Sequence, residues 1–321
     1  MIEARGLART FRSRGGPVEA VRGVDLDVAP GELVGFLGPN GAGKTTTLRL
    51  LTTLLRPTTG RATVGGCDLL TDPVGVRRQI GYVAQGGGTA YECRVREEIE
   101  IQGRFYGLSK ADTVRRGAAL ASRLDIAGLE HRLVRTLSGG QRRRLDIALG
   151  LIHAPALVFL DEPTTGLDPQ SRANLWEHIR ALRAEHGLTV FLTTHYLDEA
   201  DALCDRVLVI DNGTIVATGT PDELKSRISG DSVSVEVAPG TVPDAAGIAG
   251  RLPGAHEVTT GENTIRFRVP RGDTALPELL RALHTHGIDL RSVQVHRPSL
   301  NDVFLTLTGR TLRDAEVPGA A

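Results

Sequence analysis

A short segment near the start of the chain combines closely spaced glycines with a lysine and a threonine. Residues 38–45 read Gly-Pro-Asn-Gly-Ala-Gly-Lys-Thr, which matches the pattern G-x-x-x-x-G-K-[ST]. The glycines let backbone N–H groups wrap the phosphates of a nucleotide, the lysine reaches the β- and γ-phosphates, and the threonine hydroxyl ligates Mg²⁺. The residues predicted to bind nucleotide in this way are Gly38, Pro39, Asn40, Gly41, Ala42, Gly43, Lys44, Thr45 and Thr46.

The residues on either side of this phosphate loop (residues 38–45) support the prediction. The apolar run 33–37 has the length of a buried strand. After the loop, Leu48, Leu51 and Leu55 recur at helical spacing, which predicts a helix from Thr45 to Leu55. Strand, glycine-rich loop and helix is the required arrangement, and a helix N-terminus itself favours anions. A glycine-rich turn that arose by chance would not be expected to lie between such a strand and such a helix.

Two adjacent carboxylates follow a second apolar run. Residues 157–160 read Leu-Val-Phe-Leu and are followed by Asp161 and Glu162. At the end of such a strand, Asp161 is placed to hold Mg²⁺ through water opposite Thr45, and Glu162 is free to polarise an attacking water. Paired acids can also simply mark a helix N-terminus. In a chain with a phosphate loop, the metal and the base are the favoured interpretation.

A third motif, Leu-Ser-Gly-Gly-Gln at residues 137–141, precedes a segment predicted to be helical. Small residues before a helix form another anion-binding N-terminus. With this motif lying between the phosphate loop and the Asp-Glu strand, the chain resembles the ATP-binding cassette ATPases, whose signature is L-S-G-G-Q. The resemblance covers residues 1 to about 225, and it implies that the signature contacts ATP. The residues concerned are Ser138, Gly139, Gly140 and Gln141.

The resemblance also assigns roles to four isolated residues. Gln85 matches the Q-loop glutamine, Asp168 lies in the match to the D-loop, and His195 matches the switch histidine that contacts the γ-phosphate. A lone histidine after a strand is more often structural. Phe11 is the candidate for stacking on adenine, with an ordinary core aromatic as the alternative. The implied catalytic residues are Lys44, Gln85, Glu162, Asp168 and His195, and the implied metal ligands are Thr45, Gln85 and Asp161.

Length and composition restrict the function classes. A chain of 321 residues exceeds the usual size of a single core, which predicts one large domain and a smaller one. Basic and acidic residues number 38 each, so a nucleic-acid partner has no bulk electrostatic support.

The 3 cysteines have no ligand-like spacing and favour a reducing compartment, with plain packing as their role. We find no signal peptide or spanning segment, so we expect any membrane crossing to be done by another chain.

The pattern of apolar residues changes near residue 229. From there, alternating valines and a leucine stripe predict the order β-α-β-β-α-β, which is the ferredoxin-like arrangement. We therefore expect an α/β fold of the P-loop NTPase cassette type, with a mixed sheet and a helical subdomain, over residues 1–228. The helical subdomain covers about residues 86–150. A small C-terminal α+β accessory domain follows at 229–312, and 313–321 form a flexible tail.

Three further segments resemble one subgroup of the family, the daunorubicin-resistance type of drug-exporter ATPase. They are residues 298–309, residues 194–201 and the arginine run 142–144. From its residues alone, the arginine run is predicted to be a solvated helix face rather than a nucleic-acid contact. The order Ser299-Leu300-Asn301-Asp302 also predicts a capped terminal helix.

The resemblance implies a mechanism and partners. Two copies of the chain would pair head to tail around two ATP molecules, with the signature of each facing the phosphate loop of the other, and hydrolysis would reopen the pair. Residues 86–96 would pass the movement to a separate membrane permease, at the cytoplasmic face of the cell membrane, for efflux of drugs or other hydrophobic compounds. ATP and Mg²⁺ are the cofactors, and no nucleic acid is expected.

A soluble ATPase of the translation or DNA-repair type is the rival function. Translation-type members carry two cassettes in one chain, and repair-type members insert a long coiled coil, whereas residues 46–137 show no sustained heptads. A regulatory module without transport is a third possibility.

Overall fold

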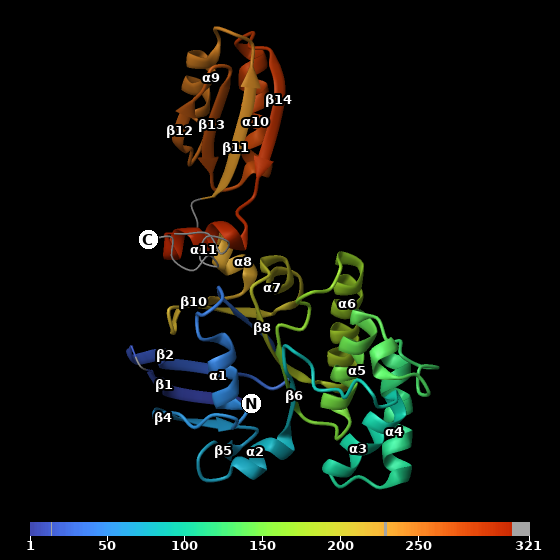
Figure 1. Ribbon diagram of the computed structural model, residues 1–321. Coiled ribbons are helices and arrows are strands. Elements are labelled where there is room, and N and C mark those ends of the chain that lie inside the picture. Colours follow the sequence, from blue (N-terminus) through green and yellow to red (C-terminus); the bar gives the residue numbers. More distant parts are fainter. Residues whose placement is uncertain (14, 228–229, 310–321) are drawn as a thin grey trace. The chain divides into compact units, whose positions relative to one another are not determined.

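The computed structural model describes residues 1–13, 15–227 and 230–309 (Figure 1). The chain divides into two compact units, of which the first ends at Pro221 and the second begins at Asp222. Each unit has a separate cluster of buried apolar side chains.

The first unit begins with an antiparallel sheet. Its strands, in spatial order, are β2 (Gly16–Val28), β1 (Ile2–Ser13), β4 (Thr59–Val64) and β5 (Cys67–Asp68). Ile2 of β1 lies between Val28 and Val64 of the flanking strands. All three side chains are buried. The period-two alternation of apolar and polar residues therefore turns one face of this sheet toward the core.

The second sheet of this unit carries the motifs. Its strands, in spatial order, are β10 (Thr214–Gly219), β9 (Arg206–Asp211), β3 (Leu33–Leu37), β8 (Thr189–Thr194), β7 (Leu157–Asp161) and β6 (Ile80–Val83). All neighbours pair in parallel except β10, which is antiparallel to β9. The three central strands, β3, β8 and β7, are buried along their whole length, as their continuous apolar runs predict. Their carboxyl ends meet at one edge, where open α/β sheets bind ligands.

Helices connect these strands. They are α1 (Lys44–Leu51), α2 (Pro73–Gln79), α3 (Val95–Phe105), α4 (Lys110–Arg123), α5 (Gly139–Leu151), α6 (Pro169–His186), α7 (Leu197–Leu203) and a short 3₁₀ turn at Val134–Thr136. Helices α3, α4 and α5 pack on one another, as expected for the helical subdomain (Figure 1). The prediction that α1 reaches Leu55 was wrong. Thr53 takes a left-handed backbone, φ 63°, which a right-handed helix cannot include.

The second unit has the predicted β-α-β-β-α-β order. Its elements are α8 (Pro221–Ser226), β11 (Asp231–Val237), α9 (Val242–Ala249), β12 (His256–Thr260), β13 (Thr264–Val269), α10 (Gly272–Thr285), β14 (Leu290–His296) and α11 (Leu300–Thr308). The antiparallel sheet has the order β12-β13-β11-β14, which is ferredoxin-like. Val233, Val235 and Leu279 are fully buried in its core. The predicted capping box at Ser299 and Asp302 is present.

Candidate active site

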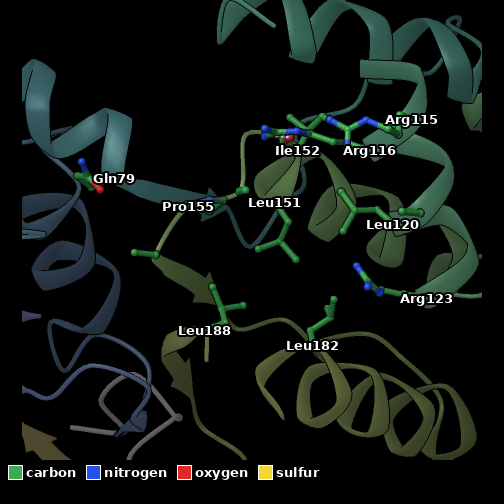
Figure 2. Close-up of a pocket in the computed structure, with 13 residues that line it drawn as sticks. Gln79, Arg115, Arg116, Leu120, Arg123, Leu151, Ile152, Pro155, Leu182 and Leu188 are labelled. Carbon is green, nitrogen blue, oxygen red and sulfur yellow. Dashed lines mark hydrogen bonds between the residues drawn. The ribbon is translucent and has the colours of Figure 1, made fainter. Parts of the chain in front are cut away.

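A cavity of about 520 Å³ lies between α4, the end of α5 and α6, away from the phosphate loop. Leu151, Leu182 and Leu188 point into it (Figure 2). Two of the arginines on its α4 wall already have ion-pair partners: Arg115 lies 2.6 Å from Asp112, and Arg123 lies 2.8 Å from Glu185. None of the sequence-predicted site residues lines this cavity.

The phosphate loop joins β3 to α1 under tight steric limits. A side chain at Gly38 would place its Cβ 2.3 Å from the Ile210 carbonyl oxygen, and one at Gly43 would lie 2.4 Å from the Ala20 carbonyl oxygen. Gly43 also has φ 103°, which L residues rarely adopt. These two glycines therefore permit close packing of the loop against β9 and β2, besides clearing space for an anion.

The loop folds back on the Lys44 side chain. Its ammonium donates to the carbonyl oxygens of Gly38, at 2.7 Å, and Pro39, at 3.0 Å. It also lies 3.2 Å from Glu162 Oε1, and the side chain is only 4 % exposed. A phosphate oxygen arriving at the loop competes with Glu162 for this ammonium.

Asp161 and Thr45 meet where the carboxyl end of β7 faces the start of α1. The Thr45 hydroxyl donates to Asp161 Oδ1 at 3.2 Å, and the Thr193 hydroxyl from β8 donates to the same oxygen at 2.6 Å. A hydroxyl and a carboxylate in contact are the hard oxygen donors that Mg²⁺ prefers. This pair therefore fits the predicted metal.

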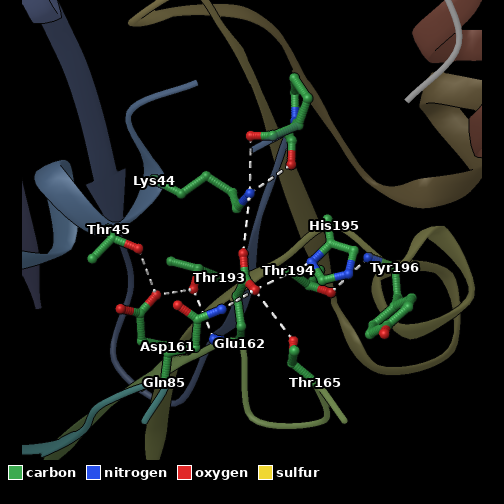
Figure 3. A network of polar contacts seen from close by, with 12 residues as sticks. Lys44, Thr45, Gln85, Asp161, Glu162, Thr165, Thr193, Thr194, His195 and Tyr196 are labelled. Carbon is green, nitrogen blue, oxygen red and sulfur yellow. Dashed lines mark hydrogen bonds and ion pairs between the residues drawn. The ribbon is translucent and has the colours of Figure 1, made fainter. Parts of the chain in front are cut away.

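Glu162 lies at the centre of the polar network (Figure 3). Its Oε2 accepts from Gln85 Nε2 at 2.8 Å and from the Thr165 hydroxyl at 3.2 Å. His195 Nδ1 lies 3.2 Å from the same oxygen. The backbone of Glu162 is left-handed, φ 44°, and its N–H bonds to Thr193. Unusual backbone angles of this kind recur at functional sites.

The charge on Glu162 follows from these contacts. Burial raises the pKa of the carboxyl, but the interactions with His195 and Lys44 outweigh burial and lower the pKa from 4.5 to about 2. At neutral pH Glu162 is therefore a buried carboxylate in contact with a lysine, an amide and a histidine, a set that can orient a water and accept its proton.

The signature segment lies outside this network. Ser138 caps α5: its hydroxyl accepts from the Gln141 N–H at 3.2 Å, and the Gln141 amide oxygen accepts from the Ser138 N–H at 3.1 Å. Ser138 and Gly139 are exposed, and a side chain at Gly140 would lie 3.2 Å from the Ser171 hydroxyl on α6. The side-chain hydrogen bonds of Ser138 and Gln141 described here therefore stay within the signature segment.

Asp168 and Phe11 also lie apart from the network. Asp168 caps α6 by accepting from the Ser171 N–H and hydroxyl at 2.8 and 2.7 Å. These two bonds lower the pKa of its carboxyl. Phe11 is partly exposed on β1 opposite Val18, and the Arg9 guanidinium lies 4.8 Å from its ring centre. Such a ring offers a face for stacking, and its role with adenine stays a prediction.

Two residues around Asp161 and Glu162 were not predicted from the sequence. Thr193 and Thr165 each bond directly to the predicted acids. The signal that could have identified Thr193 was its position two residues before His195, the match for the switch histidine. The prediction that the arginine run is a solvated face was wrong, because Arg143 and Arg144 are only 7 % and 8 % exposed. No pattern in the sequence distinguishes a buried arginine from a solvated one.

Comparison with known proteins agrees with this geometry. Residues 21–165 match the model of the ABC transporter family, and residues 219–308 match the C-terminal domain of DrrA1-3-like ATP-binding proteins. The chain is 43 % identical over 316 residues to the daunorubicin resistance ATP-binding protein DrrA2 of Streptomyces coeruleorubidus, covering 98 % of each chain. It is 39 % identical over 313 residues to the doxorubicin resistance ATP-binding protein DrrA of Mycobacterium tuberculosis, covering 96 % of this chain and 93 % of the relative.

Among solved structures, a dimeric ATP-binding cassette in a post-hydrolysis state, bound to ADP and phosphate, has a similar fold. The TM-score is 0.64 at 24 % identity, over 68 % of this chain and 98 % of that one. The phosphate loop, the Asp-Glu pair and the signature lie on this shared fold. The chain therefore belongs to the ATP-binding cassette transporter ATPases, in the daunorubicin-resistance group.

Proposed function

We propose that this ATPase powers efflux of drugs or other hydrophobic compounds through a separate membrane permease. The observation that carries the proposal is the network in which Lys44, Gln85 and His195 converge on Glu162, beside the Asp161–Thr45 pair. The substrate class rests on relatives named for resistance to daunorubicin and doxorubicin.

The chemistry follows from charge and position. Lys44 and the backbone N–H groups of the phosphate loop would bind the phosphates, while Thr45, Asp161 and Gln85 would hold Mg²⁺. That ion, when bound, neutralises charge on the phosphoryl oxygens. Glu162 accepts a proton from the attacking water, which Gln85 helps to orient, and His195 contacts the γ-phosphate. Most of the rate acceleration comes from positioning and electrostatic stabilisation.

The exposure of Ser138 and Gly139 supports a head-to-tail pair of cassettes. Because the first N–H groups of a helix lack intrahelical partners and favour anions, the start of α5 is suited to receive the γ-phosphate of an ATP bound by a second copy. Each closed pair would hold two ATP molecules, and loss of the γ-phosphate would remove the bridging contact.

Exposed apolar side chains on α3 and in the segment before it support docking of a permease. Tyr91, Ile101 and Phe105 are 54 %, 44 % and 81 % exposed. Exposed apolar groups of this size favour a protein partner. No helix in the described part of the chain has the length and apolarity needed to cross a bilayer. Our proposal places the chain at the cytoplasmic face of the membrane, bound to its permease.

Copurification tests the permease, and drug accumulation tests the direction and class of transport. We expect tagged chain to retain an integral membrane protein in detergent, and Phe105→Glu to lose it while still hydrolysing ATP. Cells that lack the chain should accumulate more daunorubicin, with rescue by the wild type but not by Lys44→Ala. Equal retention by Phe105→Glu would contradict the docking surface, and unchanged accumulation of daunorubicin would contradict the substrate class.

A further inference from the structure

The buried guanidinium of Arg143 bonds to three backbone carbonyl groups at once. Its Nε donates to the Pro163 oxygen at 2.9 Å, one terminal nitrogen donates to the Ala84 oxygen at 2.6 Å, and the other donates to the Asp161 oxygen at 2.9 Å. The planar fork of arginine can supply these donors together, whereas the compact ammonium of lysine cannot match their fixed geometry.

The three carbonyl groups are next to the proposed hydrolytic side chains. Asp161 and Pro163 are the residues immediately before and after Glu162, and Ala84 immediately precedes Gln85. The side chains of Gln85 and Glu162 are themselves hydrogen-bonded at 2.8 Å. Arg143 therefore ties together the two backbone segments whose separation sets this contact.

A second bond from the same helix holds the Gln85 segment from its other side. Asp146, one turn after Arg143 on α5, accepts from the Gly88 N–H at 3.2 Å. Helix α5 thus binds the chain at Ala84 and at Gly88, on both sides of Gln85. The same helix begins at the Ser138 cap of the signature.

Packing alone does not account for a charged group in this place. Burial lowers the pKa of the Arg143 guanidinium, while Asp146 and Asp161 act in the opposite direction. A buried cation is costly unless its donors are satisfied, and a well-packed apolar side chain would avoid that cost. The three carbonyl bonds give the guanidinium a specific structural task.

We propose that Arg143 is a positioning residue for ATP hydrolysis. It fixes the position of the backbone on both sides of Glu162, and of the backbone just before Gln85, relative to the signature helix α5. In this role it acts through Glu162 rather than on the nucleotide itself. The inference rests on the proposed role of Glu162 as the group that activates water.

Substitutions in the full-length chain separate positioning from simple stability. Arg143→Lys and Arg143→Gln should lower kcat by on the order of 10²-fold or less, because small misplacement of reacting groups carries penalties of that size. The KM for ATP should change by less than about threefold, since the phosphate loop is untouched. Arg144→Gln is the matched control: Arg144 is equally buried on α5 but contacts Asp125 instead. It should lower the melting temperature and keep kcat per folded molecule.

A double-mutant cycle with Glu162→Gln tests whether Arg143 acts through Glu162. The quantity measured is the rate of single-turnover ATP hydrolysis. If Arg143 acts through Glu162, Arg143→Lys should cost little further activity in the Glu162→Gln background. Additive losses, or wild-type kcat in Arg143→Lys and Arg143→Gln, would overturn the positioning role. Wild-type activity of Glu162→Gln alone would instead overturn the proposed function of Glu162, so the two failures are distinct.

Discussion

At the scale of single residues, the contact between Lys44 and Glu162 links binding to chemistry. Their charged atoms lie 3.2 Å apart, and both side chains are buried. Because phosphate oxygens form charge-assisted bonds with an ammonium, we expect bound ATP to draw Lys44 away from Glu162. Glu162 would then be left with Gln85 and His195 and with a more basic carboxylate, which is the condition that a general base requires.

Replacing Glu162 tests this role directly. Glu162→Gln should bind ATP with affinity similar to the wild type and hydrolyse it about 10²–10⁴-fold more slowly. Because ATP persists, the variant should also form a nucleotide-dependent dimer by size-exclusion chromatography with light scattering. Thr165→Ala, which removes one hydroxyl donor to the Glu162 carboxylate and leaves the carboxylate in place, is a milder comparison. A turnover rate equal to that of the wild type would exclude Glu162 as the base.

The same residue predicts a pH dependence of stability in the nucleotide-free protein. The pKa of Glu162 is about 2 when folded and 4.5 ordinarily. A lowered pKa contributes stability that is present above pH 4.5 and is lost as the pH falls toward 2. The shift corresponds to about 3 kcal/mol. In urea unfolding from pH 7 to pH 3, the stability gap between wild type and Glu162→Gln should narrow below about pH 4.5. A constant gap would contradict the lowered pKa.

At the scale of elements, sequence patterns predicted the motifs of the site better than the helix ends and buried contacts that hold those motifs in place. Motif spacing identified the phosphate loop and the Asp-Glu strand, because a nucleotide imposes the same chemistry wherever it binds. The end of α1 and the burial of Arg143 were not predictable, because they depend on a backbone conformation at Thr53 and on carbonyl groups far along the chain. Local patterns do not report such tertiary contacts.

The signature helix gives a prediction at this scale. Ser138→Arg places a bulky cation at the exposed start of α5 and removes the hydroxyl that caps it, a loss of about 1 kcal/mol. Isolated subunits should still bind ATP, because no contact of Ser138 in the described chain reaches the phosphate loop. Dimer formation in the Glu162→Gln background should fail. Ser138→Thr keeps the cap and is the control. Loss of ATP binding by the Ser138→Arg monomer would contradict the head-to-tail arrangement.

At the scale of the whole molecule, the chain combines two units with separate cores. The β-α-β-β-α-β order was predictable from alternating valines and a leucine stripe. One face of the sheet packs against the core and the other does not, so apolar and polar residues alternate along its strands. The polar network lies entirely within the first unit. Catalysis and the task of the second unit are therefore separable by experiment.

Truncation after Arg227 gives the last prediction. All residues of the Lys44–Glu162 network remain in the shortened chain, and the strands that carry them bury their own apolar core. We expect the affinity for ATP to change by less than about threefold, and a separate fragment of residues 230–309 to unfold cooperatively on its own, because it also has a core. Equilibrium binding of a fluorescent ATP analogue and urea unfolding measure the two outcomes. The control is the truncated chain carrying Lys44→Ala, which should bind weakly. A folded truncation with severely weakened binding would show that the second unit helps to build the ATP site.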